Sequence, residues 1–141
     1  MLTAQKTADI LSIFNSQGAM KLIGARLTEV DEGIAEFEVE FRPELSQQNG
    51  FFHAGIIGTL VDTAGGCAGA TLMPTGSNVL TVEFKLNLLA PGDGEKLRAR
   101  GEIIKSGRTL TITQGKVFVT KDGKETLCGL MQQTLISIPA Q

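Results

Sequence analysis

The stretch Gln47–Gly69 decides the fold of this 141-residue chain; it reads QQNGFFHAGIIGTLVDTAGGCAG. The apolar run from Phe51 to Met73 is too long and too poor in β-branched residues for one strand, so it predicts a buried helix. One face of that helix carries small and polar residues at helical spacing: Gly55, Gly58, Thr59, Asp62, Gly65, Gly66 and Gly69. The only aspartate of the stretch therefore lies on a face made mostly of glycine.

The glycine face predicts close packing. Each glycine inside a helix costs roughly 1 kcal/mol relative to alanine, so five of them cost about 5 kcal/mol, as much as the whole stability of a modest domain. Close approach by a sheet, another backbone or a ligand is the usual compensation. We therefore expect Gly65 and Gly66 in particular to meet a tightly packed partner.

Asp62 is the strongest candidate for chemistry in the chain. Its nearest charged neighbours in the sequence are Glu44 and Glu83, so no cation lies close to it along the chain. An unpaired carboxylate in an apolar helix is costly, which favours a catalytic use. The alternative is an aspartate that only forms hydrogen bonds within a glycine-rich helix.

The composition is that of one globular domain spanning residues 1–141. Hydrophobic residues make up 42% of the chain, and no linker-like stretch divides it. A net charge of -2, with no Tyr or Trp, argues against nucleic acid as a partner. The first 18 residues lack the pattern of a signal peptide, and Asp62 interrupts the longest apolar run. We therefore expect no membrane span and a cytoplasmic protein.

The cysteines and the histidine do not form a metal-binding pattern. Cys67 and Cys128 lack CxxC spacing, so they are interpreted as buried free thiols rather than a disulfide or a zinc site. His53 is the only histidine, which also argues against zinc. We expect neither a metal nor a bound cofactor.

The flanking segments predict a sheet around the central helix. Thr3–Asn15 has the spacing of a short amphipathic helix. Lys21–Val30 and Ile34–Phe41 predict a hairpin with one solvent-exposed face. Four long strands joined by tight turns should follow the helix as an antiparallel meander: Asn78–Leu89, Lys96–Lys105, Thr109–Lys121 and Thr126–Ile138. The fold class is thus α+β, with an antiparallel sheet wrapped around a long central helix.

This order of elements, together with the segment Gln47–Gly66, resembles the hotdog-fold acyl-CoA thioesterases of the phenylacetate-degradation type. The hallmark of that family is His-Gly-Gly followed, after a short apolar spacer, by Asp. Here it appears as His53-Ala54-Gly55 and Asp62, with alanine in place of the first glycine. Further resemblance lies, in the family's order, at Val79–Phe84, Leu89–Gly92 and Lys105–Leu110.

The resemblance implies thioester hydrolysis, which requires a base or nucleophile and donors for the developing oxyanion. Asp62 would activate water or attack the thioester directly, and we favour the water-activating base. The helix should begin near Ala54 and Gly55, so their N–H groups should be free to bind the oxyanion. Gln47 stands where some relatives have Asn and either adds a side-chain donor or is an ordinary loop residue.

Two further residues have positioning roles in this interpretation. His53 precedes Asp62 by nine residues, about 13 Å along a helix, so a direct relay within one chain is not expected. We assign His53 to holding the loop before the helix. Thr81 resembles the family's hydroxyl residue on the next strand and would position water or Asp62, although a β-branched residue is also expected in any strand.

The substrate-binding residues fall into two groups. The turn after the second long strand offers cations and backbone donors for the phosphates of coenzyme A, with a solvated hairpin end as the alternative; it comprises Lys105, Ser106, Gly107, Arg108 and Thr109. The other predicted substrate-binding residues are Asn49, Phe52, Glu83 and Pro91. Phe52 either lines the acyl pocket or fills the core.

The sequence therefore predicts an acyl-CoA thioesterase acting on a small, aryl or medium-chain acyl group. Members of the family form active sites between subunits, so we expect a homodimer at least, and a tetramer from the resemblance. Two alternatives remain open: a hotdog protein that binds acyl-CoA or a small ligand without turnover, and a hotdog dehydratase. A dehydratase should carry its histidine and its acid in a different arrangement from that of His53 and Asp62.

Overall fold

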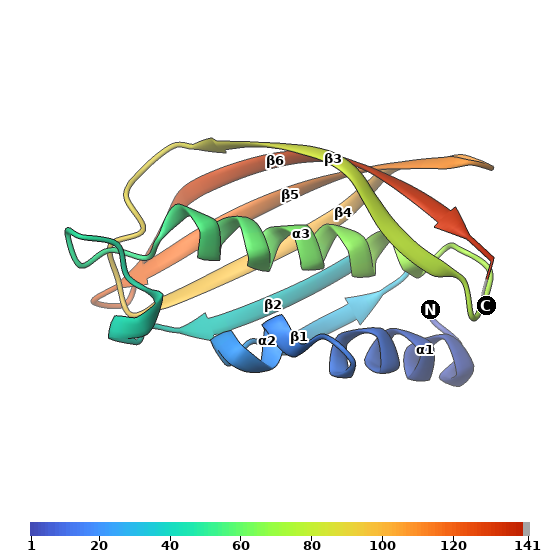
Figure 1. Cartoon of the computed structure of the whole chain (residues 1–141), viewed down its shortest axis with the longest axis horizontal. Coiled ribbons are helices and arrows are strands. Elements are labelled where there is room, and N and C mark those ends of the chain that lie inside the picture. Colours follow the sequence, from blue (N-terminus) through green and yellow to red (C-terminus); the bar gives the residue numbers. More distant parts are fainter. Residues whose placement is uncertain (140–141) are drawn as a thin grey trace.

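The computed structural model describes residues 1–139 as an antiparallel sheet curled around one long helix (Figure 1). The strands are β1 (Arg26–Asp31), β2 (Ile34–Glu40), β3 (Asn78–Leu88), β4 (Lys96–Ser106), β5 (Leu110–Lys121) and β6 (Lys124–Ile138). The helices are α1 (Ala4–Asn15), α2 (Gly18–Ile23), the 3-10 turn η1 (Pro43–Leu45) and α3 (Ala54–Ala70). The sheet order is β1-β2-β4-β5-β6-β3, and every pair is antiparallel. The predicted α+β hotdog fold is confirmed.

The first strand begins later than the sequence predicts. Residues 18–23 form the helix α2, so Lys21 is helical and β1 begins only at Arg26. The sequence Ala-Met-Lys-Leu consists of good helix formers. Gly24 then ends the helix in the left-handed conformation, at φ 74°, and its N–H donates back to the last turn. The local helix propensity therefore overrides the extended pattern that the segment suggested.

The predicted four-strand meander is wrong in one connection. The strands β4, β5 and β6 follow one another as expected, but β3 pairs with β6, from Asn78↔Ile138 to Leu88↔Gly129. The chain crosses the end of the sheet between β3 and β4, and β4 pairs with β2 instead. Turn residues indicate where the chain bends but do not choose the neighbouring strand, so β3 becomes an edge strand (Figure 1).

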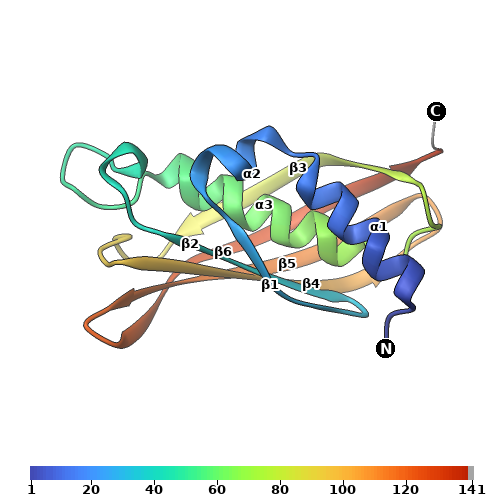
Figure 2. The same cartoon turned by 90° about the horizontal axis from the view of Figure 1, so that it is seen from below.

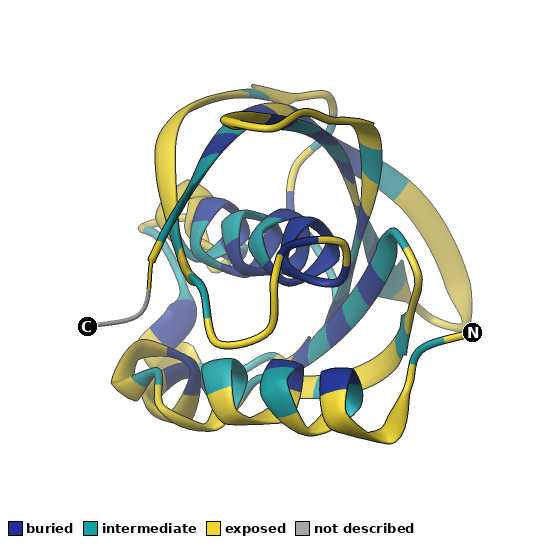
Figure 3. Ribbon diagram, turned by 90° about the vertical axis from the view of Figure 1, so that its right-hand side faces the viewer, coloured by how far each residue is buried: buried dark blue, intermediate teal, exposed yellow. Residues whose placement is uncertain are grey.

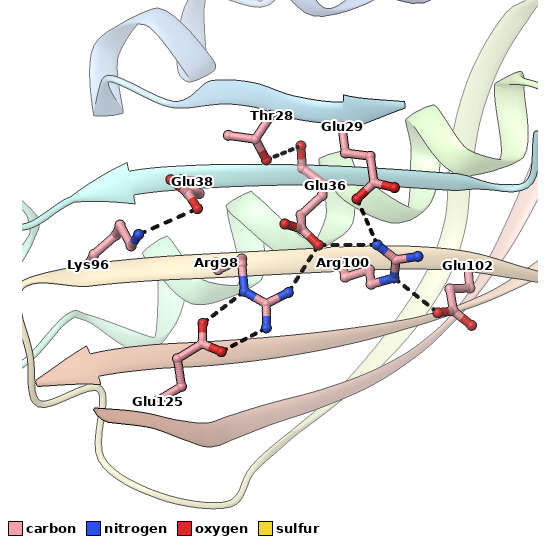
Figure 4. Close-up of polar contacts among 9 residues, drawn as sticks. All are labelled: Thr28, Glu29, Glu36, Glu38, Lys96, Arg98, Arg100, Glu102 and Glu125. Carbon is pink, nitrogen blue, oxygen red and sulfur yellow. Dashed lines mark hydrogen bonds and ion pairs between the residues drawn. The ribbon is translucent and has the colours of Figure 1, made fainter. Parts of the chain in front are cut away.

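The alternation along β2 produces one buried and one solvent-exposed face, as predicted. Ala35, Phe37 and Val39 are fully buried against α3. Glu36 points outward and pairs with Arg98 at 3.0 Å and Arg100 at 3.2 Å (Figure 4). These ion pairs belong to a belt of alternating charges that crosses β1, β2, β4 and β6 on the outer face of the sheet.

The glycine face of α3 packs against the concave face of the sheet. A Cβ at Gly65 would overlap the side-chain oxygen of Gln133 and lie 2.8 Å from Thr113 Oγ1, and one at Gly69 would overlap Leu135. The expected close approach is thus present at these two residues. The expectation for Gly66 is wrong within the chain, because a Cβ there would meet nothing within 4 Å.

The N-terminal helix α1 lies beside α3 (Figure 2). Thr3 caps α1 by accepting the Lys6 N–H. The buried Lys6 side chain then donates to Met73 O at 2.6 Å and Ala70 O at 3.4 Å, at the C-terminal end of α3. The outer surface of α1 is exposed while α3 is buried at the centre of the fold (Figure 3). No helix within residues 1–139 has the length and apolarity needed to cross a bilayer.

Candidate active site

Asp62 lies half-buried in the middle of α3 and is held by two side chains from the sheet. Its Oδ1 atom accepts hydrogen bonds from Thr81 Oγ1 on β3 at 2.7 Å and from Gln133 Nε2 on β6 at 2.6 Å. Within residues 1–139, Oδ2 accepts no hydrogen bond. The structure thus brings together the two predicted residues, Asp62 and Thr81, and leaves one carboxylate oxygen free.

Gln133 and Thr113 belong to this cluster and were not predicted. Gln133 is 1% exposed and Thr113 is fully buried. Thr113 Oγ1 donates to Gln133 Oε1 at 2.7 Å. The alternation of β6 could have revealed Gln133, because it shares the inward face with Met131 and Leu135. A buried amide among apolar residues needs polar partners, and Asp62 is the nearest such group.

Two cavities open beside Asp62. One, of about 500 Å³, lies between α1, α3 and β3 and has polar walls, which include Asp9, Ser12, Ser16, Gln17, Asn78 and Thr81. The other, of about 570 Å³, lies between α2, α3 and β3 and includes the apolar side chains of Met20, Phe84 and Leu86. Asp62 and Gln17 line both cavities. The carboxylate therefore lies between a polar cavity and a more apolar one.

The start of α3 differs in one respect from the prediction. His53 is the N-cap, and its Nδ1 atom accepts the Gly55 N–H at 2.7 Å. The Gly55 N–H is therefore occupied, and it can serve as an oxyanion donor only after this bond opens. The Ala54 N–H has no acceptor within residues 1–139. The N-cap geometry agrees with the task assigned to His53, which is to hold the entry to the helix.

A third cavity, of about 610 Å³, lies next to this helix start. Its walls include five predicted site residues besides Ala54: Gln47, Asn49, Phe52, His53 and Pro91. The Gln47 side-chain oxygen accepts the N–H groups of Asn49 and Phe51, which closes the loop before α3. Phe52 is 2% exposed and packs edge-on against Phe41 at 5.2 Å, so most of its ring belongs to the core.

The remaining predicted residues lie away from Asp62. Glu83 lines a separate groove with Lys85 and Gln132. The turn from Ser106 to Thr109 is exposed at the tip of the β4–β5 hairpin. That tip lies near the C-terminal end of α3, whereas the loop from Gln47 to His53 lies at the other end (Figure 1). Within one chain, the two groups of predicted substrate-binding residues are therefore not adjacent.

Both cysteines are free and buried, as predicted. Burial, with a contribution from the Asp62 charge, raises the pKa of the Cys67 thiol to about 12. Burial also raises the pKa of Cys128 to about 11. Both thiols are therefore protonated at neutral pH and are poor nucleophiles.

Comparison with known proteins identifies the family. The family model described as "Thioesterase superfamily" matches residues 49–126. A thioesterase family protein from Silicibacter pomeroyi is 37% identical, with a TM-score of 0.94 over 96% of this chain and 99% of that one. A thioesterase from Haemophilus influenzae is 26% identical, with a TM-score of 0.80 over 92% of this chain and 88% of that one.

The PaaI protein from the E. coli phenylacetic acid degradation operon shares the fold. It is 16% identical, and its structure superposes with a TM-score of 0.87 over 100% of this chain and 99% of that one. The match to the family model covers the start of α3, Asp62 and Thr81. This chain therefore belongs to the thioesterase superfamily and is a thioester hydrolase with the hotdog fold.

Proposed function

We propose that this protein hydrolyses acyl-CoA thioesters and that Asp62 is the catalytic base. The observation that carries the proposal is the arrangement of its carboxylate, in which Oδ1 is bound by Thr81 and Gln133 while Oδ2 accepts no hydrogen bond within residues 1–139. Asp62 also lines two cavities, so a water molecule and a thioester have room beside it. Volumes near 500 Å³ fit a small, aryl or medium-chain acyl group.

The proposed reaction uses Asp62 to activate water. Oδ2 takes a proton from the water, whose oxygen forms a bond to the thioester carbonyl carbon. The carbonyl oxygen becomes an oxyanion, which backbone N–H donors stabilise. The carbon–sulfur bond then breaks, and the coenzyme A thiolate takes up the proton held by Asp62. The products are the free acid and coenzyme A, and no metal or cofactor takes part.

The oxyanion donors are proposed to come from a second copy of the chain. Ala54 precedes Asp62 by eight residues, which corresponds to about 12 Å along a helix. One carbonyl group cannot contact both residues across that distance. A homodimer that places the start of one α3 near the Asp62 of another would complete the site. The exposed edge of β3 supports such an assembly.

The substitution Asp62→Asn tests this function. Asparagine keeps the size of the side chain and can still accept hydrogen bonds from Thr81 and Gln133, but it cannot take a proton from water. We expect kcat on a panel of acyl-CoAs to fall by about 10²-fold or more, while the Kd for a bound acyl-CoA changes little. Release of free thiol, followed with a thiol reagent, gives the rate.

The control is Asp93→Asn, which removes an exposed carboxylate that pairs with Lys121 far from the cluster. It should leave kcat unchanged. Wild-type turnover in the folded Asp62→Asn variant would contradict the assigned base. A wild-type protein that binds acyl-CoA but releases no thiol would instead support the binding protein, and release of water from a 3-hydroxyacyl-CoA would support the dehydratase.

A further inference from the structure

We propose that Gln133 is a positioning residue for the reaction at Asp62, because it determines which of the two carboxylate oxygens is free to react. The inference rests on the proposed function of Asp62 as the base. Gln133 lies 71 positions away from Asp62 in the sequence, on β6, the last strand of the chain.

Gln133 occupies a position where an apolar side chain would be expected. It is 1% exposed and lies on the inward face of β6, between the buried side chains of Met131 and Leu135. Burying an amide without hydrogen-bond partners destabilises a protein. Both ends of this amide have partners, and one of them is the catalytic candidate.

The chemistry of the neighbours fixes the orientation of the amide. The Gln133 nitrogen contacts Asp62 Oδ1 at 2.6 Å and the Asp62 backbone oxygen at 3.1 Å, and both are acceptors when the carboxylate is ionised. A flipped amide would place its own oxygen against these two acceptors. The Thr113 hydroxyl donates to Gln133 Oε1 at 2.7 Å and so holds the unflipped orientation.

This orientation makes the two carboxylate oxygens different. Oδ1 receives the Gln133 amide and the Thr81 hydroxyl, so its lone pairs are engaged and the carboxylate plane cannot rotate freely. Oδ2 keeps its lone pairs for water. Orientation of a catalytic group contributes to the rate because it removes unproductive arrangements before the reaction begins.

The helix sequence makes room for this amide. Gly65 follows Asp62 by three residues and faces the same strand, and a Cβ at position 65 would overlap Gln133 Oε1. Gly66, the next residue, faces open space. Because residue 65 has no side chain, the Gln133 amide has room to lie against the helix at this point.

The experiment compares Gln133→Met with the matched control Gln132→Met. Methionine fills a similar volume without donors, and Gln132 is an exposed neighbour on the same strand. We expect kcat of Gln133→Met to fall about tenfold or more with KM within about twofold of wild type, since positioning affects the transition state more than substrate binding. Gln132→Met should keep both values.

Three further variants separate an effect on positioning from an effect on stability alone. In an Asp62→Asn background, Gln133→Met should cause no additional loss of kcat, because the group that it positions is no longer a base. Thr113→Val removes only the hydroxyl that orients the amide and should lower kcat in the same direction, while Thr113→Ser should restore it. Thermal unfolding and circular dichroism establish that each variant is folded.

A folded Gln133→Met variant with wild-type kcat would overturn the inference. If that variant does not fold, Thr113→Val decides, and wild-type kcat in folded Thr113→Val would overturn it equally. If Gln133→Met lowers kcat further in the Asp62→Asn background, Gln133 does not act through Asp62. Absence of hydrolysis by the wild-type protein would refute the proposed function itself, which is a different result.

Discussion

Gly65 is the residue on which the packing around Asp62 depends most directly. We predict that Gly65→Ala destabilises the protein by about 1–3 kcal/mol, because its methyl group would overlap the Gln133 amide and approach Thr113. It should also lower kcat by displacing Gln133 from Asp62. Chemical denaturation measures the free energy of unfolding, and the thiol-release assay measures kcat.

The matched control at this scale is Gly66→Ala. The new methyl group would enter open space, and alanine is roughly 1 kcal/mol better than glycine inside a helix. The free energy of unfolding should therefore stay equal or rise. Equal stability of the Gly65 and Gly66 variants would contradict the packing described for α3.

At the residue scale, the sequence predicts one half of the cluster. Asp62 stands out because it is the only charge in a long apolar run, and Thr81 because of its resemblance to family members. The signal for Gln133 is weak, because only the alternation of β6 marks it as inward, and Thr113 carries none, since polar residues are common in strands with one exposed face. Their inward orientation is established only when the strand register is known.

At the scale of elements, β3 is an edge strand with an exposed apolar surface. Leu80, Val82 and Phe84 are 52%, 57% and 43% exposed. Such an edge is a template for pairing with another chain, and a lysine on an edge strand opposes that pairing. We predict that Val82→Lys converts the proposed dimer to a monomer, as measured by analytical ultracentrifugation, and lowers kcat with it.

The control for this prediction is Ile104→Lys, which places the same charge on a β-branched residue that is 59% exposed on β4. It should keep the assembly of the wild type. A Val82→Lys variant that sediments as the wild-type dimer would exclude β3 as the interface. A wild-type monomer with full activity would exclude the shared site altogether.

The elements themselves were predictable and their neighbours were not. The bounds of β3, β4, β5 and β6 agree with the sequence-based ranges within two residues, because alternation and turn residues are local signals. The pairing of β3 with β6 depends on the path across the end of the sheet, which is a property of the whole fold. The helix α2 was missed because a six-residue helix is shorter than the period-based signal requires.

At the scale of the whole molecule, the predicted phosphate-binding turn and the loop before α3 lie at opposite ends of that helix (Figure 1). If Lys105 and Arg108 bind the phosphates of coenzyme A, they do so for a site completed by another chain. We predict that replacing both with Gln raises KM for acyl-CoA and leaves kcat little changed, because the phosphates lie far from the thioester. Steady-state kinetics at low and high salt measure the effect.

An acyl-pantetheine substrate provides the control, since it lacks the nucleotide. Its KM should be the same for the wild type and for the double variant. If KM for acyl-CoA is also the same at both salt concentrations, the nucleotide binds elsewhere and the turn at Ser106 is a solvated hairpin end.

The helix α1 lines a cavity beside Asp62 but is attached to the fold elsewhere. The helix α1 lies outside the sheet and is anchored through Lys6 at the C-terminal end of α3. Ser12 and Ser16 line the polar cavity beside Asp62. Within residues 1–139, neither serine forms a hydrogen bond with the carboxylate or with its two donors, Thr81 and Gln133. If this cavity holds the acyl group, as proposed, substitutions in its wall can alter which acyl groups fit while the cluster around Asp62 stays intact. The choice of substrate and the chemistry could then evolve, or be engineered, independently of each other.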